Sequence, residues 1–579
     1  MHKICLSLLL LLSIKGYTQT IKGYISDDED NSLSSVNISI LNEKNGAISD
    51  KEGKYIINIK ANRSVVLAYS FIGFKIEKIR IPMLKKGQIY ELDINLKSSS
   101  TTLEDVIITD QKNRKESFNR IKPKHVSVLP GNSGGIEAIL KTLPGVSSAN
   151  ELSSQYSVRG GNFDENLVYV NGIEIYRPFL VRSGQQEGLS FVNTDMVNSI
   201  LFSAGGFDAK YGDKMSSVLD ITYKKPKKNK ASLKLSLLGG STHFEGLNQN
   251  KRFSYLIGAR HKTSKYLLNS LDTDAEYTPS FSDLQTYLNY KIDTDWTISF
   301  LGNISNNKYK MIPKNRDTDF GTVNEALKLT IYFEGQEIDK YETYFGALST
   351  LFKPNLNLQL QFTTSGFRTF EEESFDIIGE YWLYQLENNL GSDEFGDIAF
   401  DRGVGKYINH ARNSLNATVI NFSHSGYYIN ENLQFEWGAR LQKEEIEDKI
   451  SEWSLIDSAF FNFPHPPDNI GNNADPDQEI IISELQKTKI NLSSYRNSGF
   501  MQVSKDINNF TISAGTRASY WTYNEEFIMS PRISIAYVPL WKKDIVLRAA
   551  TGVYYQSPFY KELRTVEGTL NKNIQSQKS

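Results

Sequence analysis

Hydrophobic and polar residues alternate along much of the second half of the chain. From position 433 to position 441 the odd positions are Leu, Phe, Trp, Ala and Leu, and the even positions are Gln, Glu, Gly and Arg. A strand with this period of two presents one apolar face and one polar face. Further strands of this kind are expected at 284–292, 296–302, 356–364, 510–520 and 545–555.

Short turns are expected to join these strands in pairs. Six stand out, at residues 248–251, 293–295, 353–355, 430–432, 506–509 and 540–544. The segments 305–342, 368–409 and 443–493 are rich in Asn, Asp and Glu, which predicts long outer loops. Six inner turns imply about 13 strands by residue 556, so residues 230–579 are predicted to form an antiparallel transmembrane β-barrel.

This predicted barrel is expected to be incomplete. Outer-membrane transporters with a plugged lumen have about 22 strands. An open sheet edge in lipid leaves backbone groups without hydrogen bonds. Residues 571–579 are polar and do not form a terminal strand with a final aromatic residue. A smaller closed barrel is the alternative interpretation.

The first segment, residues 1–19, has a different pattern. It carries Lys3, an apolar run at 4–12, and then Lys15 and Gly16. A positive start followed by roughly 7–15 apolar residues is typical of a secretory signal peptide, and the run is too short for a membrane helix. No other stretch has the ~18 apolar residues that a membrane helix needs. If the exported chain spans a membrane, it is expected to do so with strands.

Residues 20–97 are expected to form a small β-sandwich, because six short β-rich runs are separated by turn residues. Four of its strings are GYISD at 23–27, SVNISI at 35–40, SDKEGKYIINI at 49–59 and LAYSFIGF at 67–74. Together they resemble the carboxypeptidase-regulatory-like domain, which is a non-catalytic module. The acidic residues 27–30 are interpreted as a solvated hairpin turn, since a Ca²⁺ site needs six or more oxygens around the ion.

Residues 98–127 are predicted to be a linker that contains one apolar stretch. This stretch consists of Leu103, Glu104, Asp105, Val106, Ile107, Ile108 and Thr109. An extended segment flanked by polar residues can add a strand to the edge of a partner's sheet. The alternative is that it forms the last strand of the preceding sandwich.

Residues 128–226 contain the most specific strings of the chain. A short amphipathic helix at 136–143 is followed by YSVRGG at 156–161, VYVNGIEIYRP at 168–178 and AGGFDAKYGDKMSSVLDI at 204–221. Asn171 and Gly172 between two β-rich runs predict a two-residue hairpin turn. In this order, after the sandwich, these segments resemble the plug domain of TonB-dependent outer-membrane receptors, in the Bacteroidetes branch that carries the regulatory-like sandwich. The predicted fold is therefore mainly β: a sandwich, a mixed α/β plug and a barrel.

The resemblance implies a receptor in the outer membrane that imports a scarce nutrient, such as a siderophore, cobalamin, an oligosaccharide or a peptide. Residues 103–109 would be the TonB box, and the partners would be TonB, the nutrient, outer-membrane lipid and a surface lipoprotein. Arg159, Tyr176 and Arg177 are candidate ligand-binding residues, although internal salt bridges to the barrel wall are an equal expectation. A surface adhesion or signalling receptor without transport is the alternative function.

Composition excludes several other classes of protein. The 579 residues carry a net charge of -2, which gives no field to attract nucleic acid. The single Cys cannot form a disulfide within the chain. The string GNSGG at 131–135 mimics that of trypsin-like proteases, but its nearest upstream His is His125 in the linker. The other His residues are scattered, so no catalytic residue, metal site or cofactor is predicted.

Overall fold

The computed structural model divides into two compact units, residues 1–112 with 538–546 and residues 113–537 with 547–579. It describes residues 18–579 except 29, 42–45, 61–63, 72–73, 75, 86, 98–117, 122, 124–134, 149–153, 177–188, 271–273, 323, 431, 457–481, 540, 542–544 and 566–567. The predicted TonB box, most of the predicted signal peptide, Arg177, His125 and residues 131–134 lie outside the described residues. Within the described part of the chain, no helix is long and apolar enough to cross a membrane.

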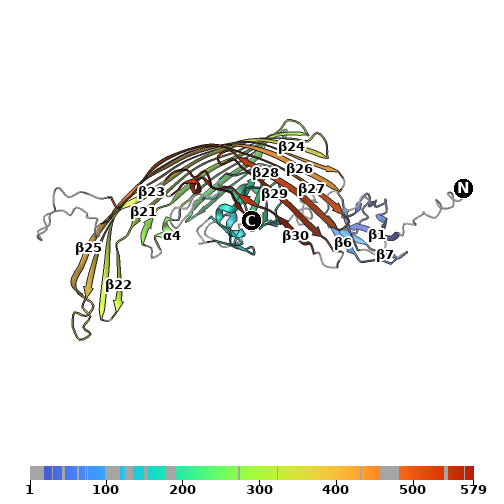
Figure 1. Cartoon of the computed structure of the whole chain (residues 1–579). Coiled ribbons are helices and arrows are strands. Elements are labelled where there is room, and N and C mark those ends of the chain that lie inside the picture. The colour runs from blue at the N-terminus through green and yellow to red at the C-terminus, as the bar shows by residue number, and fades with distance from the viewer. Residues whose placement is uncertain are drawn as a thin grey trace, which may run out of the picture. The chain divides into compact units, whose positions relative to one another are not determined.

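Residues 18–96 form the β-sandwich that the sequence predicts (Figure 1). One sheet has the order β4-β1-β7, with β8 also paired to β1, and the other has the order β3-β2-β5-β6. The strands are β1 (Thr18–Asp27), β2 (Asn37–Ile40), β3 (Gly46–Ile48), β4 (Lys54–Lys60), β5 (Val65–Ser70), β6 (Glu77–Ile81), β7 (Ile89–Glu91) and β8 (Ile94–Leu96). Alternate residues such as Ile57 and Leu67 are buried in a shared apolar core. The first strand thus begins two residues before the predicted domain boundary.

The predicted plug is built on a five-stranded mixed sheet with the order β13-β12-β15-β14-β9. Its elements are β9 (Asn119–Ile121), α3 (Ile136–Leu140), β10 (Val146–Ser147), β11 (Ser157–Val158), η2 (Phe163–Glu165), β12 (Asn166–Val170), β13 (Ile173–Glu174), η3 (Thr194–Met196), β14 (Val197–Ser203) and β15 (Ser217–Tyr223). Asn171 and Gly172 have φ of 54° and 77° and form the predicted turn between β12 and β13. Strand β9 lies within the predicted linker. The sequence did not predict this strand, because it belongs to a charged run.

A large antiparallel sheet follows, and its main path has the 13 strands expected from six inner turns. They are β16 (Lys230–Ser236), β17 (Gly239–Leu247), β18 (Phe253–Lys262), β20 (Ser280–Lys291), β21 (Trp296–Pro313), β23 (Glu325–Phe352), β24 (Leu358–Leu386), β25 (Ile398–Asn430), β26 (Leu433–Ile456), β27 (Glu484–Ile507), β28 (Phe510–Trp521), β29 (Glu526–Tyr537) and β30 (Leu547–Gly552). The predicted turns at 248–251, 293–295, 353–355 and 506–509 each lie where two consecutive paired strands meet. Residues 431, 540 and 542–544 of the other two predicted turns lie outside the described residues. Among the described residues, β16 and β30 are the two ends of this order.

The predicted outer loops are wrong for most of their length. Most of 305–342 and 368–409 instead continues the sheet, with strands as long as the 33 residues of β25. So do residues 443–456 and 484–493 of the third segment, whose residues 457–481 lie outside the described part of the chain. Two short strands, β19 (Ala275–Tyr277) and β22 (Arg316–Thr322), and the helix α4 (Lys265–Leu268) accompany these hairpins. Both faces of such a hairpin can be polar where they meet water, so strand pairing persists without the apolar alternation used to recognise it.

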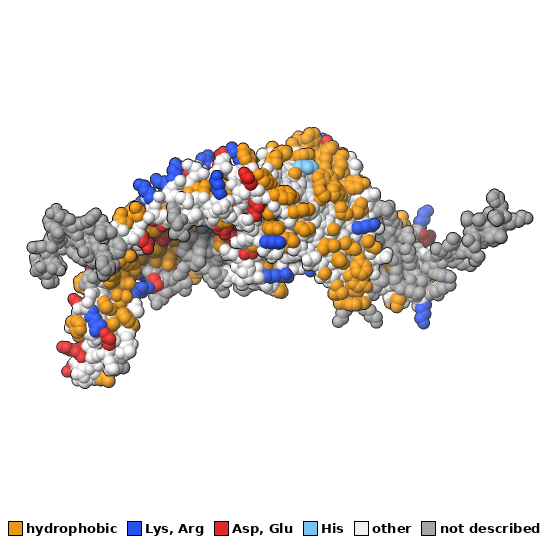
Figure 2. All heavy atoms as spheres, in the orientation of Figure 1, with side chains coloured by type: hydrophobic (Ala, Val, Ile, Leu, Met, Phe, Trp, Pro, Cys, Tyr) orange, Lys and Arg blue, Asp and Glu red, His pale blue; other side chains and the backbone are white. Residues whose placement is uncertain are grey.

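The two faces of the large sheet differ in chemistry. Figure 2 shows hydrophobic side chains gathered over β27, β28 and β29 on its outer face. Met501 and Val503 are exposed there, whereas Gln502 between them is buried on the opposite face. The inner face is partly apolar too, because Leu301 and Phe345 join the core of the predicted plug. The polar inner face expected from the alternation is therefore interrupted where the plug packs on it.

The end of the described chain lies against the inner face of the same sheet. Residues after β30 form β31 (Tyr555–Gln556), the 3-10 helix η4 (Tyr560–Leu563) and β32 (Gln577–Lys578). Tyr560 and Leu563 are buried with Trp521 of β28 and Leu492 of β27 in a small apolar cluster. This segment forms part of the wall of the larger cavity described below.

Candidate functional site

Two arginines of the large sheet form ion pairs with the predicted plug. Arg517 of β28 donates from Nη2 to Oδ2 of Asp213 at 2.7 Å, and Arg440 of β26 lies 3.2 Å from the same oxygen. Arg440 also pairs with Glu174 of β13. Two arginines from different strands therefore hold one aspartate of the plug, and one of them binds a second carboxylate.

The surroundings of Asp213 fix its charge. Burial would raise the pKa of this carboxyl, but Arg517 and Arg440 outweigh burial, and the pKa lies well below its ordinary value. Asp213 has a φ of 66°, which is uncommon for a residue other than glycine. This turn directs the carboxylate towards the sheet, where it stays ionised.

Arg532 of β29 binds backbone carbonyl oxygens of the plug loop that precedes Asp213. Its Nη1 donates to the carbonyl oxygens of Asp208 at 2.7 Å and Tyr211 at 2.5 Å. The guanidinium also lies over the ring of Tyr554, 4.3 Å from the centroid. The loop of residues 207–213 is thus held at both ends by arginines of the sheet.

A second set of contacts lies on the other side of the plug. Arg260 of β18 donates to the carbonyl oxygens of Val192 at 2.8 Å and Ser190 at 2.9 Å, and it pairs with Asp283 of β20. The hydroxyl of Tyr223 donates to Oε1 of Gln285 at 2.8 Å. Polar residues of the early strands therefore hold the plug as well.

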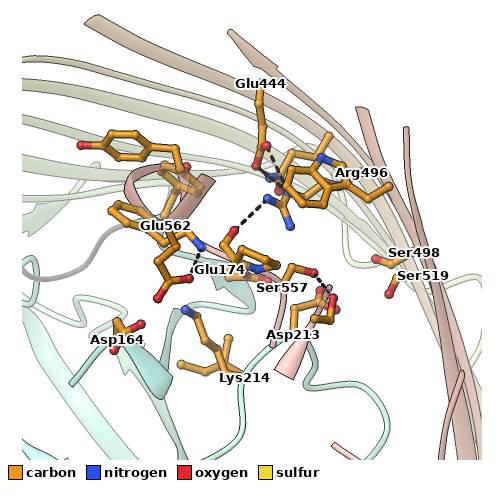
Figure 3. A pocket seen from close by; sticks show the side chains of 18 of the residues that line it. Asp164, Glu174, Asp213, Lys214, Glu444, Arg496, Ser498, Ser519, Ser557 and Glu562 are labelled. Atoms are coloured by element: carbon orange, nitrogen blue, oxygen red, sulfur yellow. Dashed lines mark hydrogen bonds and ion pairs between the residues drawn. The ribbon is translucent and has the colours of Figure 1, made fainter. Parts of the chain in front are cut away.

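A cavity of about 350 Å³ lies between the predicted plug and β26, β27 and β28. Residues of the plug, the sheet and the segment after β30 line it, including Phe163, Asp164, Glu174, Tyr176, Asp213, Lys214, Arg440, Glu444, Ile446, Arg496, Trp521, Glu526, Phe559 and Glu562. Figure 3 shows that Glu444 and Arg496 approach it from the sheet and Asp164 and Lys214 from the plug. This larger cavity has a mixed charged and aromatic wall, which suits an amphipathic ligand.

A smaller cavity of about 310 Å³ lies nearer the short turns of the sheet. On β26 it is lined by Glu436, Gly438, Ala439 and Arg440, whereas the larger cavity is lined by Arg440, Gln442, Glu444 and Ile446. Arg440 and Glu174 line both cavities. The ion pairs of Arg440 therefore stand where the two spaces adjoin.

Aromatic contacts fix the wall of the larger cavity. The guanidinium of Arg496 stacks on the indole of Trp521, 3.7 Å from the centroid, while its Nε donates to Glu444 at 3.0 Å. The indole nitrogen donates to the hydroxyl of Ser494 at 3.1 Å. Because each of these groups has a partner, this wall is preorganised rather than free to rearrange.

The sequence-predicted ligand residues occupy different places. Tyr176 lines the larger cavity, and its ring packs against Phe367 of β24. Arg159 is an exposed turn residue with a φ of 51°, and it lines neither cavity. Arg177 lies outside the described residues. The ligand-binding role of all three stays a prediction.

Sequence reasoning missed the other charged residues of this site. Asp213 and Lys214 stand inside the string used to recognise the plug, and the alternation of β26 places Arg440 on its inner face. Nothing in the sequence indicates that these positions meet, because Asp213 and Arg517 are 304 residues apart. Glu337, Asp339 and Glu373 of β23 and β24 likewise come within 4.8 Å of one another although no local spacing predicts a metal site.

Comparison with known proteins identifies two domains. Residues 21–108 match the CarboxypepD_reg-like domain, and residues 101–217 match the TonB-dependent receptor plug domain. The chain carries the plug domain of a TonB-dependent receptor. The sandwich before the plug is the regulatory-like domain, as the sequence predicts, and the two matched segments meet in the predicted linker.

The chain is also similar to individual known proteins. A TonB-dependent receptor of Formosa agariphila is 22% identical over 241 residues, which cover 38% of this chain and 22% of that receptor. Among solved structures, the ferric preacinetobactin receptor BauA of Acinetobacter baumannii covers 80% of this chain and 67% of its own, at 10% identity and a TM-score of 0.46. The RagAB peptide importer covers 76% and 60%, at 9% identity and a TM-score of 0.46. The match thus spans about a fifth of the curated relative's length.

Proposed function

We propose that this chain acts as a TonB-dependent receptor in the outer membrane and imports a nutrient. The observation that carries the proposal is the plug domain packed on the inner face of an antiparallel sheet whose outer face is apolar. A sheet with this distribution of side chains suits lipid on one side and a filled lumen on the other. The plug then blocks the lumen until it is rearranged.

The larger cavity is the proposed ligand site. It lies between plug residues and the sheet, so that a bound molecule contacts both. Binding there would act on the residues next to Asp213 and Glu174, which tie the plug to Arg440 and Arg517. A ligand that changes these ion pairs would loosen the plug from the wall, since removing one partner of a buried pair is strongly destabilising.

TonB is the proposed source of energy, and residues 103–109 are the proposed segment that it binds. An extended apolar segment can add a strand to a partner's sheet through main-chain hydrogen bonds. Export by the predicted signal peptide at residues 1–19 precedes insertion. A surface lipoprotein that delivers the ligand remains a predicted partner.

Deleting the gene tests the proposal. The deletion strain is expected to lose growth on one defined iron or glycan source, or on another defined nutrient, and to recover it when the gene is restored. The protein should fractionate with outer membranes and migrate faster on an unboiled gel than on a boiled one. A periplasmic or secreted product, or normal growth and uptake on every source, would overturn the proposed transport function.

A further inference from the structure

Most charged groups that face the larger cavity already have partners. Glu174 and Asp213 pair with Arg440, and Glu444 pairs with Arg496 at 3.0 Å. These groups form the cavity wall and are not available to bind a ligand without breaking an ion pair.

Two further carboxylates of the cavity are also engaged. Glu562 accepts a hydrogen bond from the backbone nitrogen of Phe559 at 2.8 Å. Glu526 accepts one from the hydroxyl of Ser576 at 2.6 Å. Glu562 thus caps the helix η4 within the segment after β30, and Glu526 of β29 binds that segment to the sheet.

Lys214 and Asp164 are different. Among the described residues, no hydrogen bond or ion pair is formed by the ammonium of Lys214. Oδ1 of Asp164 is shielded from solvent and accepts no hydrogen bond, although Oδ2 accepts one from Gln556 at 3.1 Å. Figure 3 shows that the amine of Lys214 points into the space between Asp164 and Glu562. One cation and one anion thus face the cavity with unused hydrogen-bonding capacity.

The cost of leaving Lys214 unpaired points to an anionic group on the ligand. Burial lowers the pKa of Lys214, and the carboxylates of Asp164 and Glu174 act against this shift. Lys214 is half-buried, so its ammonium has lost part of its water, which a ligand anion beside it would replace. An anion alone, however, would leave Oδ1 of Asp164 unpaired, and a cation alone would leave Lys214 unpaired.

The remaining wall sets the size and polarity of the ligand. Phe163, Tyr176, Ile446, Leu492 and Ile528 line the cavity, so an apolar group is accommodated beside the two charges. The volume of about 350 Å³ is at the small end of the range for ligand pockets. Large ligands such as a folded macrocycle do not fit this space without rearrangement.

We infer that the larger cavity binds a small zwitterion of amino-acid or dipeptide chemistry, with its carboxylate on Lys214, its ammonium on Asp164 and an apolar side group against Phe163 and Tyr176. This inference deepens the proposed import function and rests on it. Lys214 and Asp164 act as two charge-matched binding residues, so that only a ligand with both charges satisfies the site.

Binding of four probes to the full chain in detergent tests the inference. The probes are the dipeptide alanyl-phenylalanine, its N-acetyl form, its C-terminal amide and the form blocked at both ends, measured by isothermal titration calorimetry. Losing a hydrogen bond between charged groups is expected to weaken binding about 10-fold or more. Each singly blocked probe should therefore bind about 10-fold more weakly, and the doubly blocked probe should bind least.

Two variants test which residue binds each charge of the ligand. Lys214→Met should bind the free dipeptide about 10-fold more weakly than the wild type does. It should bind the C-terminal amide as well as the wild type does, because the amide lacks the carboxylate that would pair with Lys214. Asp164→Asn should behave likewise towards the N-acetyl probe. Lys228→Met and Asp319→Asn remove exposed charges away from the cavity and should bind all four probes as the wild type does. The blocked probes test the wild-type protein as well, so the result does not depend on variant folding.

The outcomes separate this inference from the proposed function. No binding of the free dipeptide, or equal binding of free and blocked probes, overturns the zwitterion site. If the deletion strain nevertheless loses uptake of another nutrient, the proposed transport function stands without it. Charge-selective binding in a strain with normal uptake of every nutrient would support the site and overturn the transport function.

Discussion

Arg517 and Asp213 form an ion pair between the sheet and the plug, with Nη2 of the arginine 2.7 Å from Oδ2 of the aspartate. The arginine side chain is 7% exposed and the aspartate side chain 22%. Both charges have given up most of their water, so each depends on the other. Arg440 shares the same carboxylate at 3.2 Å, which makes Asp213 the centre of a three-residue network.

Asp213→Ala is expected to destabilise the protein by about 3 kcal/mol or more, because it leaves Arg517 buried without its partner. The measurement is the midpoint of thermal unfolding in detergent, followed by circular dichroism. Arg517→Met should lower the free energy of unfolding by a similar amount. The double variant should be less damaging than the sum of the single variants, since neither buried charge remains unpaired. Additive effects would show that the two residues do not interact.

Gly212→Ala is expected to break the same contact by crowding. A Cβ at this position would lie 1.9 Å from Nε and 2.2 Å from Cδ of Arg517, so the arginine must move away from Asp213. A loss of about 2 kcal/mol is expected, as for a lost hydrogen bond between charged groups. Gly366→Ala on β24 is the matched control, because no atom lies within 4 Å of its added Cβ. Equal unfolding midpoints for the two variants would contradict this explanation.

The local pattern of polar and apolar residues predicted those strands whose two faces differ in polarity. The four inner turns that lie within the described residues, the alternation of β26 and the Asn171–Gly172 turn are confirmed, because each depends on residues close in sequence. The long hairpins were missed because segments such as 368–409 are rich in Asn, Asp and Glu, which predicts loops. Hydrogen bonds of the backbone, which no side-chain pattern reports, extend β24 to Leu386 and begin β25 at Ile398.

The candidate site could not be predicted in the same way. Tyr176 was found because it belongs to a recognisable string, and it does line the larger cavity. Lys214 and Asp164 are ordinary charged residues in sequence, and their unused hydrogen-bonding capacity depends on burial by strands far along the chain. Arg159 belongs to another such string, yet it is an exposed turn residue. Packing between distant segments, which the sequence does not report, decides which charges meet.

Asp208→Asn is expected to stabilise the protein at neutral pH, in contrast to the change at Asp213. Burial raises the pKa of Asp208, although Lys210 acts against the shift. An unfolded aspartate titrates near 3.9, so the folded state binds the proton more tightly and loses stability as pH rises through the raised pKa. The variant should therefore unfold a few degrees above the wild type at pH 7–8 and match it near pH 3.

The pH profile of unfolding, from pH 3 to pH 8, measures this effect. Asp319→Asn in the exposed strand β22 is the control and should follow the wild-type profile. A profile for Asp208→Asn that runs parallel to that of the wild type would mean that Asp208 does not contribute to the pH dependence.

Val106→Pro, introduced into the chromosomal gene, is expected to reduce nutrient uptake at least ~10-fold while ligand still binds at the cell surface. Proline removes a backbone N–H and therefore a hydrogen bond that a strand added to TonB would form. Uptake of the nutrient identified with the deletion strain is the readout, and binding to chilled cells is measured in parallel. Gln111→Pro, in the same linker but outside 103–109, should leave both unchanged. Normal uptake with Val106→Pro, or an equal loss with Gln111→Pro, would remove the assignment of residues 103–109 as the TonB box.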